Sequence, residues 1–205
     1  MSNKYIALDS YIDIINHYWF SLEPDKRRIF DSWMDNSKNK LGQGVRPLFY
    51  RLLKEAEKGN LLHWLATKDG YIAHTILIDQ LSRYFYRNTE REFRNSYRCI
   101  LFIEMGYDLY IGKLSLLEKI AIFIPYLHIE DLDYQKNTSQ LLKIFIEKEQ
   151  QSVDKNILKV LQYNLLSRIR ILEAFGRFPK RNYILGRLST EEEIDYIDSR
   201  EGQEY

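Results

Sequence analysis

The sequence is poor in cysteine, in net charge and in long apolar runs. One cysteine among 205 residues excludes a disulfide framework and a cysteine-rich zinc module. Thirty lysines and arginines oppose 29 acidic residues, so no overall field attracts nucleic acid or a membrane surface. No apolar run reaches about 18 residues, and the start of the chain lacks the apolar region of a signal peptide. These absences predict a soluble, cytoplasmic protein without a metal site.

Glycine and proline are also scarce, with nine and four residues. Few turn-forming residues favour long helices over many short strands, and apolar residues recur mostly at spacings of three and four. Hydrophobic residues make up 45% of the chain, which is enough for a large core. The sequence therefore predicts one all-α domain over residues 1–205, with a flexible acidic tail at 199–205. We expect about nine or ten helices in antiparallel pairs, forming a bundle or a short solenoid.

Three predicted helix starts carry the capping box, Ser/Thr-x-x-Glu. In this motif the hydroxyl accepts a hydrogen bond from a backbone amide of the first turn, and the glutamate reaches back to the amide of the cap residue. The three pairs are Thr89 with Glu92, Ser115 with Glu118, and Ser189 with Glu192.

One predicted helix, beginning near Tyr71, is apolar nearly all round for its first two turns and then becomes polar. Asp79 and Arg83 follow at a spacing of four, Arg87 lies one turn further on, and Gln80 lies beside them. An apolar helix lies inside a domain, so Asp79 must be paired or strongly hydrogen-bonded. Either Asp79 and Arg83 pair and only pin the helix, or the polar side chains face a pocket.

A second apolar helix leads into Pro125 and is followed directly by His128, Glu130 and Asp131. A histidine near a helix C-terminus and beside carboxylates is a candidate general acid or base. It is equally a candidate for a structural histidine that bonds a carbonyl at the helix end. One imidazole with neighbouring carboxylates, and no second histidine at helical spacing, is a poor metal signature.

The segment between residues 175 and 188 combines four cations with no acid. A stiff loop that carries guanidinium groups suits a phosphate or a carboxylate. Alternatively, the arginines tie the loop to helix ends and to acids such as those in residues 191–198. The cations are Arg177, Lys180, Arg181 and Arg187, Asn182 follows them in the loop, and we expect Phe175, Phe178 and Tyr183 to anchor it to the core.

Several motifs occur in a fixed order along nearly the whole chain, from Trp19 to Ile197. In this order they resemble the bacterial domain of unknown function 924 family. The resemblance implies an all-α fold like that of tetratricopeptide repeats and implies no established activity. The motifs are Trp19-Phe20, Trp64, Asp79–Thr89, Pro125–Asp131, Phe175–Asn182, Leu185–Arg187 and Ser189–Glu193.

The chain departs from the family pattern at a few positions. Arg168 and Lys180 stand where the resemblance implies histidines. These two replacements remove histidines that a reaction of the family would need if it used several of them. They affect a site that binds an anion less. The matching polar residues are Asp79, Gln80, Arg83, His128, Glu130, Arg177, Arg181 and Asn182.

Two classes of function follow, and no cofactor can be named for either. The first is a pocket for an anionic small molecule, to which three distant stretches of the chain contribute. The second is a helical module that binds a peptide or a partner protein without catalysis. In the first, the catalytic candidates are His128, Glu130 and Asp79, and the ligand-binding candidates are Gln80, Arg83, Arg87, Arg177, Lys180, Arg181 and Asn182.

Overall fold

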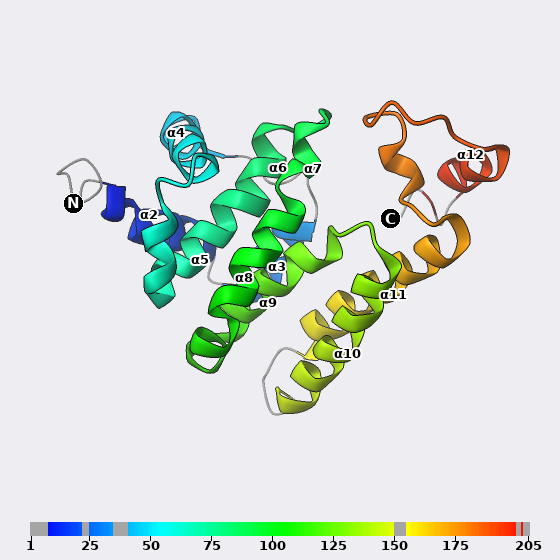
Figure 1. Cartoon of the computed structure of the whole chain (residues 1–205). Coiled ribbons are helices and arrows are strands. Elements are labelled where there is room, and N and C mark those ends of the chain that lie inside the picture. Colours follow the sequence, from blue (N-terminus) through cyan, green and yellow to red (C-terminus); the bar gives the residue numbers. More distant parts are fainter. Residues whose placement is uncertain (1–7, 22–24, 35–40, 150–154, 200–201, 203–205) are drawn as a thin grey trace. The chain divides into compact units, whose positions relative to one another are not determined.

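A computed structural model describes residues 8–21, 25–34, 41–149, 155–199 and 202. Among these residues there are nine α-helices of at least eight residues, and there is no strand (Figure 1). The all-α prediction is confirmed, whereas the tetratricopeptide-like arrangement stays a prediction. The predicted tail falls largely on residues 200–205, most of which lie outside the described residues. None of the described helices is long and apolar enough to cross a membrane.

The chain separates into two compact units. The first comprises residues 1–87 and 91–125, and the second comprises residues 88–90 and 126–205. The prediction of a single domain stays untested, and each unit is described by itself.

The first unit is built around α5 (Lys68–Ile76), on which every residue from Gly70 to Ile76 is buried. Helix α5 contacts α2, α8 and a short 3-10 turn, so its apolar circumference is covered as the sequence predicts. Three tryptophans belong to this unit. Trp19 and Trp33 stack with ring centroids 6.1 Å apart, and Trp64 is fully buried. The α-helices are α2 (Tyr11–Phe20), α3 (Lys26–Met34), α4 (Arg46–Glu57), α5, α6 (Ser82–Phe85), α7 (Arg91–Arg94), α8 (Ser96–Tyr110) and most of α9 (Leu116–Leu127).

Two close approaches fix α5 in place. A Cβ on Gly70 would lie 2.3 Å from the carbonyl oxygen of Trp64, so only glycine fits where the 3-10 turn (Leu62–Ala66) leads into α5. A Cβ on Gly106 of α8 would lie 2.6 Å from the ring of Tyr71, whose hydroxyl donates to the carbonyl of Ile103. These contacts hold one face of α8 against α5 and turn its opposite face outward.

The second unit contains α10 (Leu132–Lys148), α11 (Lys155–Phe175) and α12 (Glu191–Asp198). Helices α10 and α11 pack along each other. A small core forms where the loop after α11 folds back, because Phe178 is fully buried against Ile171 and Leu172. Tyr183 was also expected to anchor this loop, but 96% of its surface is exposed. Phe175 and Phe178 pack at the small core and polar contacts hold the loop, so Tyr183 is not needed as an anchor.

Of the three predicted capping boxes, one is confirmed, one is shifted by a residue, and the box of Thr89 and Glu92 stays a prediction. The Ser115–Glu118 box opens α9 as predicted, and α7 begins two residues after Thr89. The predicted box of Ser189 and Glu192 is wrong by one residue, because Thr190 and Glu193 form the box of α12. The hydroxyl of Ser189 instead accepts a hydrogen bond from Asn182. Pro125 does not end its helix at once, since α9 continues to Leu127.

Candidate functional site

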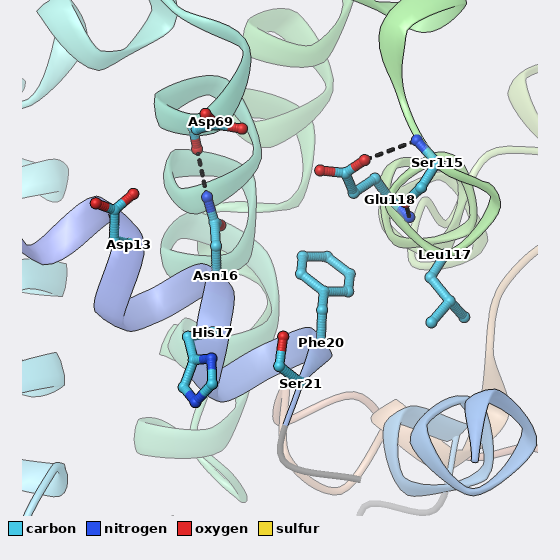
Figure 2. A pocket seen from close by; sticks show the side chains of 9 residues that line it. All are labelled: Asp13, Asn16, His17, Phe20, Ser21, Asp69, Ser115, Leu117 and Glu118. Atoms are coloured by element: carbon cyan, nitrogen blue, oxygen red, sulfur yellow. Dashed lines mark hydrogen bonds between the residues drawn. The ribbon is translucent and has the colours of Figure 1, made fainter. Parts of the chain in front are cut away.

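The first unit contains a pocket of about 560 Å³, which is large enough for a small organic molecule (Figure 2). Three elements form its wall: α2, the start of α5 and the start of α9. Three of the lining side chains are carboxylates, and the ring of Phe20 supplies an aromatic wall. The polar lining comprises Asp13, Asn16, His17, Ser21, Asp69, Ser115 and Glu118.

Helix α2 lines the pocket with its polar face and packs on the core with its apolar face. Ile15 and Trp19 are buried on the core side. Asp13, Asn16 and His17 recur at helical spacing on another face and line the pocket. The side-chain amide of Asn16 donates to the backbone carbonyl of Asp69 at 2.9 Å, which joins α2 to the start of α5.

The charges at the pocket favour a cation. The ammonium of Lys68 lies 2.7 Å from Asp69 and 3.0 Å from Glu118, two of the lining carboxylates. Burial acts to lower the pKa of Lys68, but the hydrogen bonds and charges of these two acids outweigh it and raise that pKa. The wall therefore stabilises a half-buried positive charge.

Glu118 also has a local structural role. One of its carboxylate oxygens accepts from the backbone amide of Ser115 at 2.7 Å, and its own amide donates to the hydroxyl of Ser115 (Figure 2). This box fixes the carboxylate at the N-terminus of α9, so its position does not depend on a ligand. By contrast, Asp13 is exposed and has no hydrogen bond or ion pair within the described part of the chain.

The predicted cluster around Asp79 is present in the first unit, and it is buried. It lies at a π-helical turn, Leu77–Leu81, that follows α5. The carboxylate of Asp79 accepts from Arg83 at 3.3 Å and from the amide of Gln80 at 2.7 Å. Arg83 also donates to the hydroxyl of Ser96 at 2.7 Å. These contacts match the alternative in which Asp79 and Arg83 pair and pin the helix, and none of the three lines the pocket.

In the second unit, one carboxylate joins two of the predicted stretches. Glu130 accepts from the backbone amide of Phe178 at 2.7 Å, and it forms ion pairs with Arg181 at 3.3 Å and Arg187 at 2.8 Å. Arg181 also donates to the backbone carbonyl of His128 at 2.9 Å. The second unit thus brings the residues after α9 together with the loop after α11.

A second carboxylate holds the other end of this loop. Glu193 is buried and receives Arg177 in a two-pronged ion pair at 2.6 and 2.7 Å. It also accepts from the amide of Asn182 at 3.0 Å and from the backbone of Thr190 at 2.9 Å. The hydrogen bond from Arg177 is the largest cause that lowers the pKa of Glu193, to about 2. Arg177 and Asn182 are therefore engaged in holding α12 to the loop.

The remaining predicted residues lie near this network or apart from it. The side chain of Lys180 is half-buried, and burial lowers its pKa. Arg168 donates to the backbone carbonyl of Asn164, one turn earlier on α11. In the first unit, the guanidinium of Arg87 lies 6.0 Å from the ring centre of Tyr84. The described residues contain no group of three histidine, cysteine or acidic side chains placed to bind a metal ion.

Sequence reasoning missed the pocket. Glu118 was recognised only as a capping residue, and Asp13 and Asp69 were not singled out. No spacing connects these residues, because they come from three elements far apart in the chain. The weak signal was the polar face of α2, opposite its apolar stripe.

Comparisons with known proteins agree with the motifs. A search of curated proteins found no match. Among solved structures, the fold is similar to that of ATU0120 from Agrobacterium tumefaciens, described as a protein of unknown function. The TM-score is 0.73 at 22% identity, over 93% of this chain and 98% of that chain. The model of the DUF924 family, described as a bacterial protein of unknown function, matches residues 15–201. The chain therefore belongs to the DUF924 family.

Proposed function

We propose that this protein binds a positively charged small molecule in the pocket of its first unit. The observation that carries the proposal is the position of Lys68, whose half-buried ammonium is held by two carboxylates of the pocket wall. The wall has three carboxylates, and one ammonium group pairs with two of them, so negative charge remains in excess and favours an ammonium or guanidinium group of a ligand. The third carboxylate, Asp13, is exposed and available to such a group.

The lining suits an amine that also has an apolar part. The aromatic ring of Phe20 lines the pocket, and the face of such a ring can bind both a cation and a hydrocarbon chain. Ser21 and Ser115 supply polar groups at the edge. This proposal changes the sign of the ligand expected from the sequence, because the predicted arginines do not line this pocket.

Diaminobutane tests the proposal, with butanediol as its uncharged counterpart. We expect diaminobutane to raise the melting temperature and to give a binding isotherm in calorimetry, and butanediol to give neither. Asp13→Asn removes one exposed carboxylate, so binding should weaken about twofold to fivefold.

Asp195→Asn is the matched control, since it removes an exposed acid of α12, outside the pocket. This variant should bind diaminobutane as tightly as the unchanged protein. Equal weakening in both variants would indicate nonspecific attraction between charges. Equal responses to the diamine and the diol would refute a cation site.

A second candidate function is the anion site expected from the sequence, now confined to the loop of the second unit. The loop carries four cations, and the acids placed against its arginines in the described residues are Glu130 and Glu193. This surplus of positive charge supports binding of a phosphate or a carboxylate. In this function His128 stays the candidate acid or base, with Glu130 of the same unit as its orienting group.

Inorganic phosphate is the probe for the second candidate. We expect Lys180→Gln to weaken phosphate binding about threefold to tenfold in calorimetry, because it removes one half-buried cation of the loop. Lys143→Gln, on the exposed surface of α10, is the control and should leave binding unchanged. If phosphate produces no heat and no shift in melting temperature, the loop arginines have a structural role only.

A further inference from the structure

Helix α8 exposes a row of large apolar side chains. Tyr97, Leu101, Met105 and Leu109 follow each other at a spacing of four, with 53%, 59%, 69% and 62% of their surface exposed. Residues at this spacing form a continuous ridge along a helix. We call these four residues the α8 ridge.

The α8 ridge does not belong to the core of the first unit. The core side of α8 consists of other residues, among them Cys99, Ile103 and Gly106, and it is held against α5. Another exposed apolar residue, Leu62, lies near α8, because Leu62 and Arg98 of α8 both lie within about 4 Å of the position that a Cβ on Gly59 would take. An exposed apolar row of this length is typical of an interaction surface.

The charges around the ridge are divided between its two ends. Arg98 lies in the first turn of α8 and Arg94 ends α7 just before it, whereas Glu104 and Asp108 lie toward the end of α8. Two such helices attract each other when they run in opposite directions, because each basic end then meets an acidic end. A parallel pair would place like charges together.

We propose that the α8 ridge is a self-association surface, on which the α8 helix of a second copy of this chain packs antiparallel. The ridge suits a two-fold axis near Ile103, because Tyr97 then lies opposite Leu109 and Leu101 lies opposite Met105. With the same axis, Arg98 of one copy and Asp108 of the other copy lie at the same end of the paired helices. Ridges at a spacing of four interdigitate in the commonest packing of two helices, and a two-fold pair uses one surface twice.

The oligomeric state of the full chain tests this proposal. We expect a dimer in sedimentation and light scattering, and a monomer for Leu101→Asp, with the same helical circular dichroism and melting temperature at low protein concentration. Leu188→Asp, at an apolar residue of the second unit that is 91% exposed, should remain a dimer.

Cross-linking tests the direction of the helices. Chains with Leu101→Cys, mixed with chains with Met105→Cys, should form disulfide-linked pairs faster than either chain forms with itself. The native cysteine, Cys99, is buried, and burial raises its pKa well above the ordinary value, so it contributes little background.

Three outcomes would overturn the proposal. The first is a monomer at all concentrations, and the second is a dimer that Leu101→Asp leaves intact. The third is that the unchanged protein is a monomer and that Leu101→Asp lowers its melting temperature. This result would mean that the chain itself covers the ridge. A faster cross-link between two Leu101→Cys chains would contradict the antiparallel direction.

Discussion

At the scale of single residues, His74 is an unusual side chain among those that the structure describes. It lies on α5 with no exposed surface, its ring meets that of Phe102 edge-on, and neither ring nitrogen has a hydrogen-bond partner among the described residues. Burial is the main cause that lowers its pKa from 6.5 to about 4, and the charge of Arg98 adds to it. At neutral pH the folded protein therefore holds an uncharged imidazole.

This histidine makes stability depend on pH. Its folded pKa lies below its unfolded pKa, so the unfolded chain binds the proton first. The stabilisation is complete above about pH 6.5 and is lost as the pH falls toward 4. We expect the free energy of unfolding to fall by about 3 kcal/mol over that range through His74 alone. Urea unfolding at several pH values measures it.

His74→Leu should remove most of that dependence, because leucine fills a similar volume and takes no proton. Its stability at pH 4 should then approach its stability at neutral pH, apart from the contributions of the acidic residues. The control is His17→Asn, at an exposed position on α2. If His74→Leu loses as much stability on acidification as the unchanged protein, burial of this imidazole is not the cause.

At the scale of elements, charged contacts and the small core around Phe178 together hold the loop after α11 in the second unit. Glu130 receives a backbone amide and two arginines, and all three partners come from the stretch between Phe178 and Arg187. Removing this carboxylate takes one ion pair from each of Arg181 and Arg187, whose side chains are 13% and 27% exposed. Such a loss costs more than the loss of a surface ion pair.

We therefore expect Glu130→Ala to lower the free energy of unfolding by about 2 kcal/mol. Limited proteolysis should cut the loop at residues 178–187 faster in this variant. Glu147→Ala, at an exposed residue of α10, is the control and should change stability by less than about 0.5 kcal/mol. Similar losses in the two variants would show that the network around Glu130 contributes little.

The elements also show what could be predicted from the sequence. The helices, the burial of the segment after Tyr71 and the Asp79–Arg83 pair depend on contacts within a few turns, which spacing encodes. The contact between Glu130 and Arg181 joins residues 51 positions apart, and no local pattern specifies it. The shift of the last capping box to Thr190 comes with a contact that the box motif does not encode, because Asn182 donates to the hydroxyl of Ser189.

At the scale of the whole molecule, the acids of the pocket come from α2, α5 and α9, so their meeting is decided by the fold of the first unit. These acids do not form a sequence motif, and an acidic residue is common on the surface of any one helix. The arginine loop, by contrast, is conspicuous in sequence, and the structure assigns most of its visible contacts to holding itself in place. The contacts described for the motif residues hold the loop, whereas the residues that line the pocket belong to no motif.

The positions of the tryptophans have a practical consequence. All three lie in the first unit, where two of them stack and the third is fully buried. Fluorescence excited selectively from tryptophan therefore reports the unfolding of that unit, whereas far-ultraviolet circular dichroism follows the helices of both units. If the two probes give the same unfolding curve, the two units unfold together in one cooperative transition. If the curves differ, each unit has its own stability.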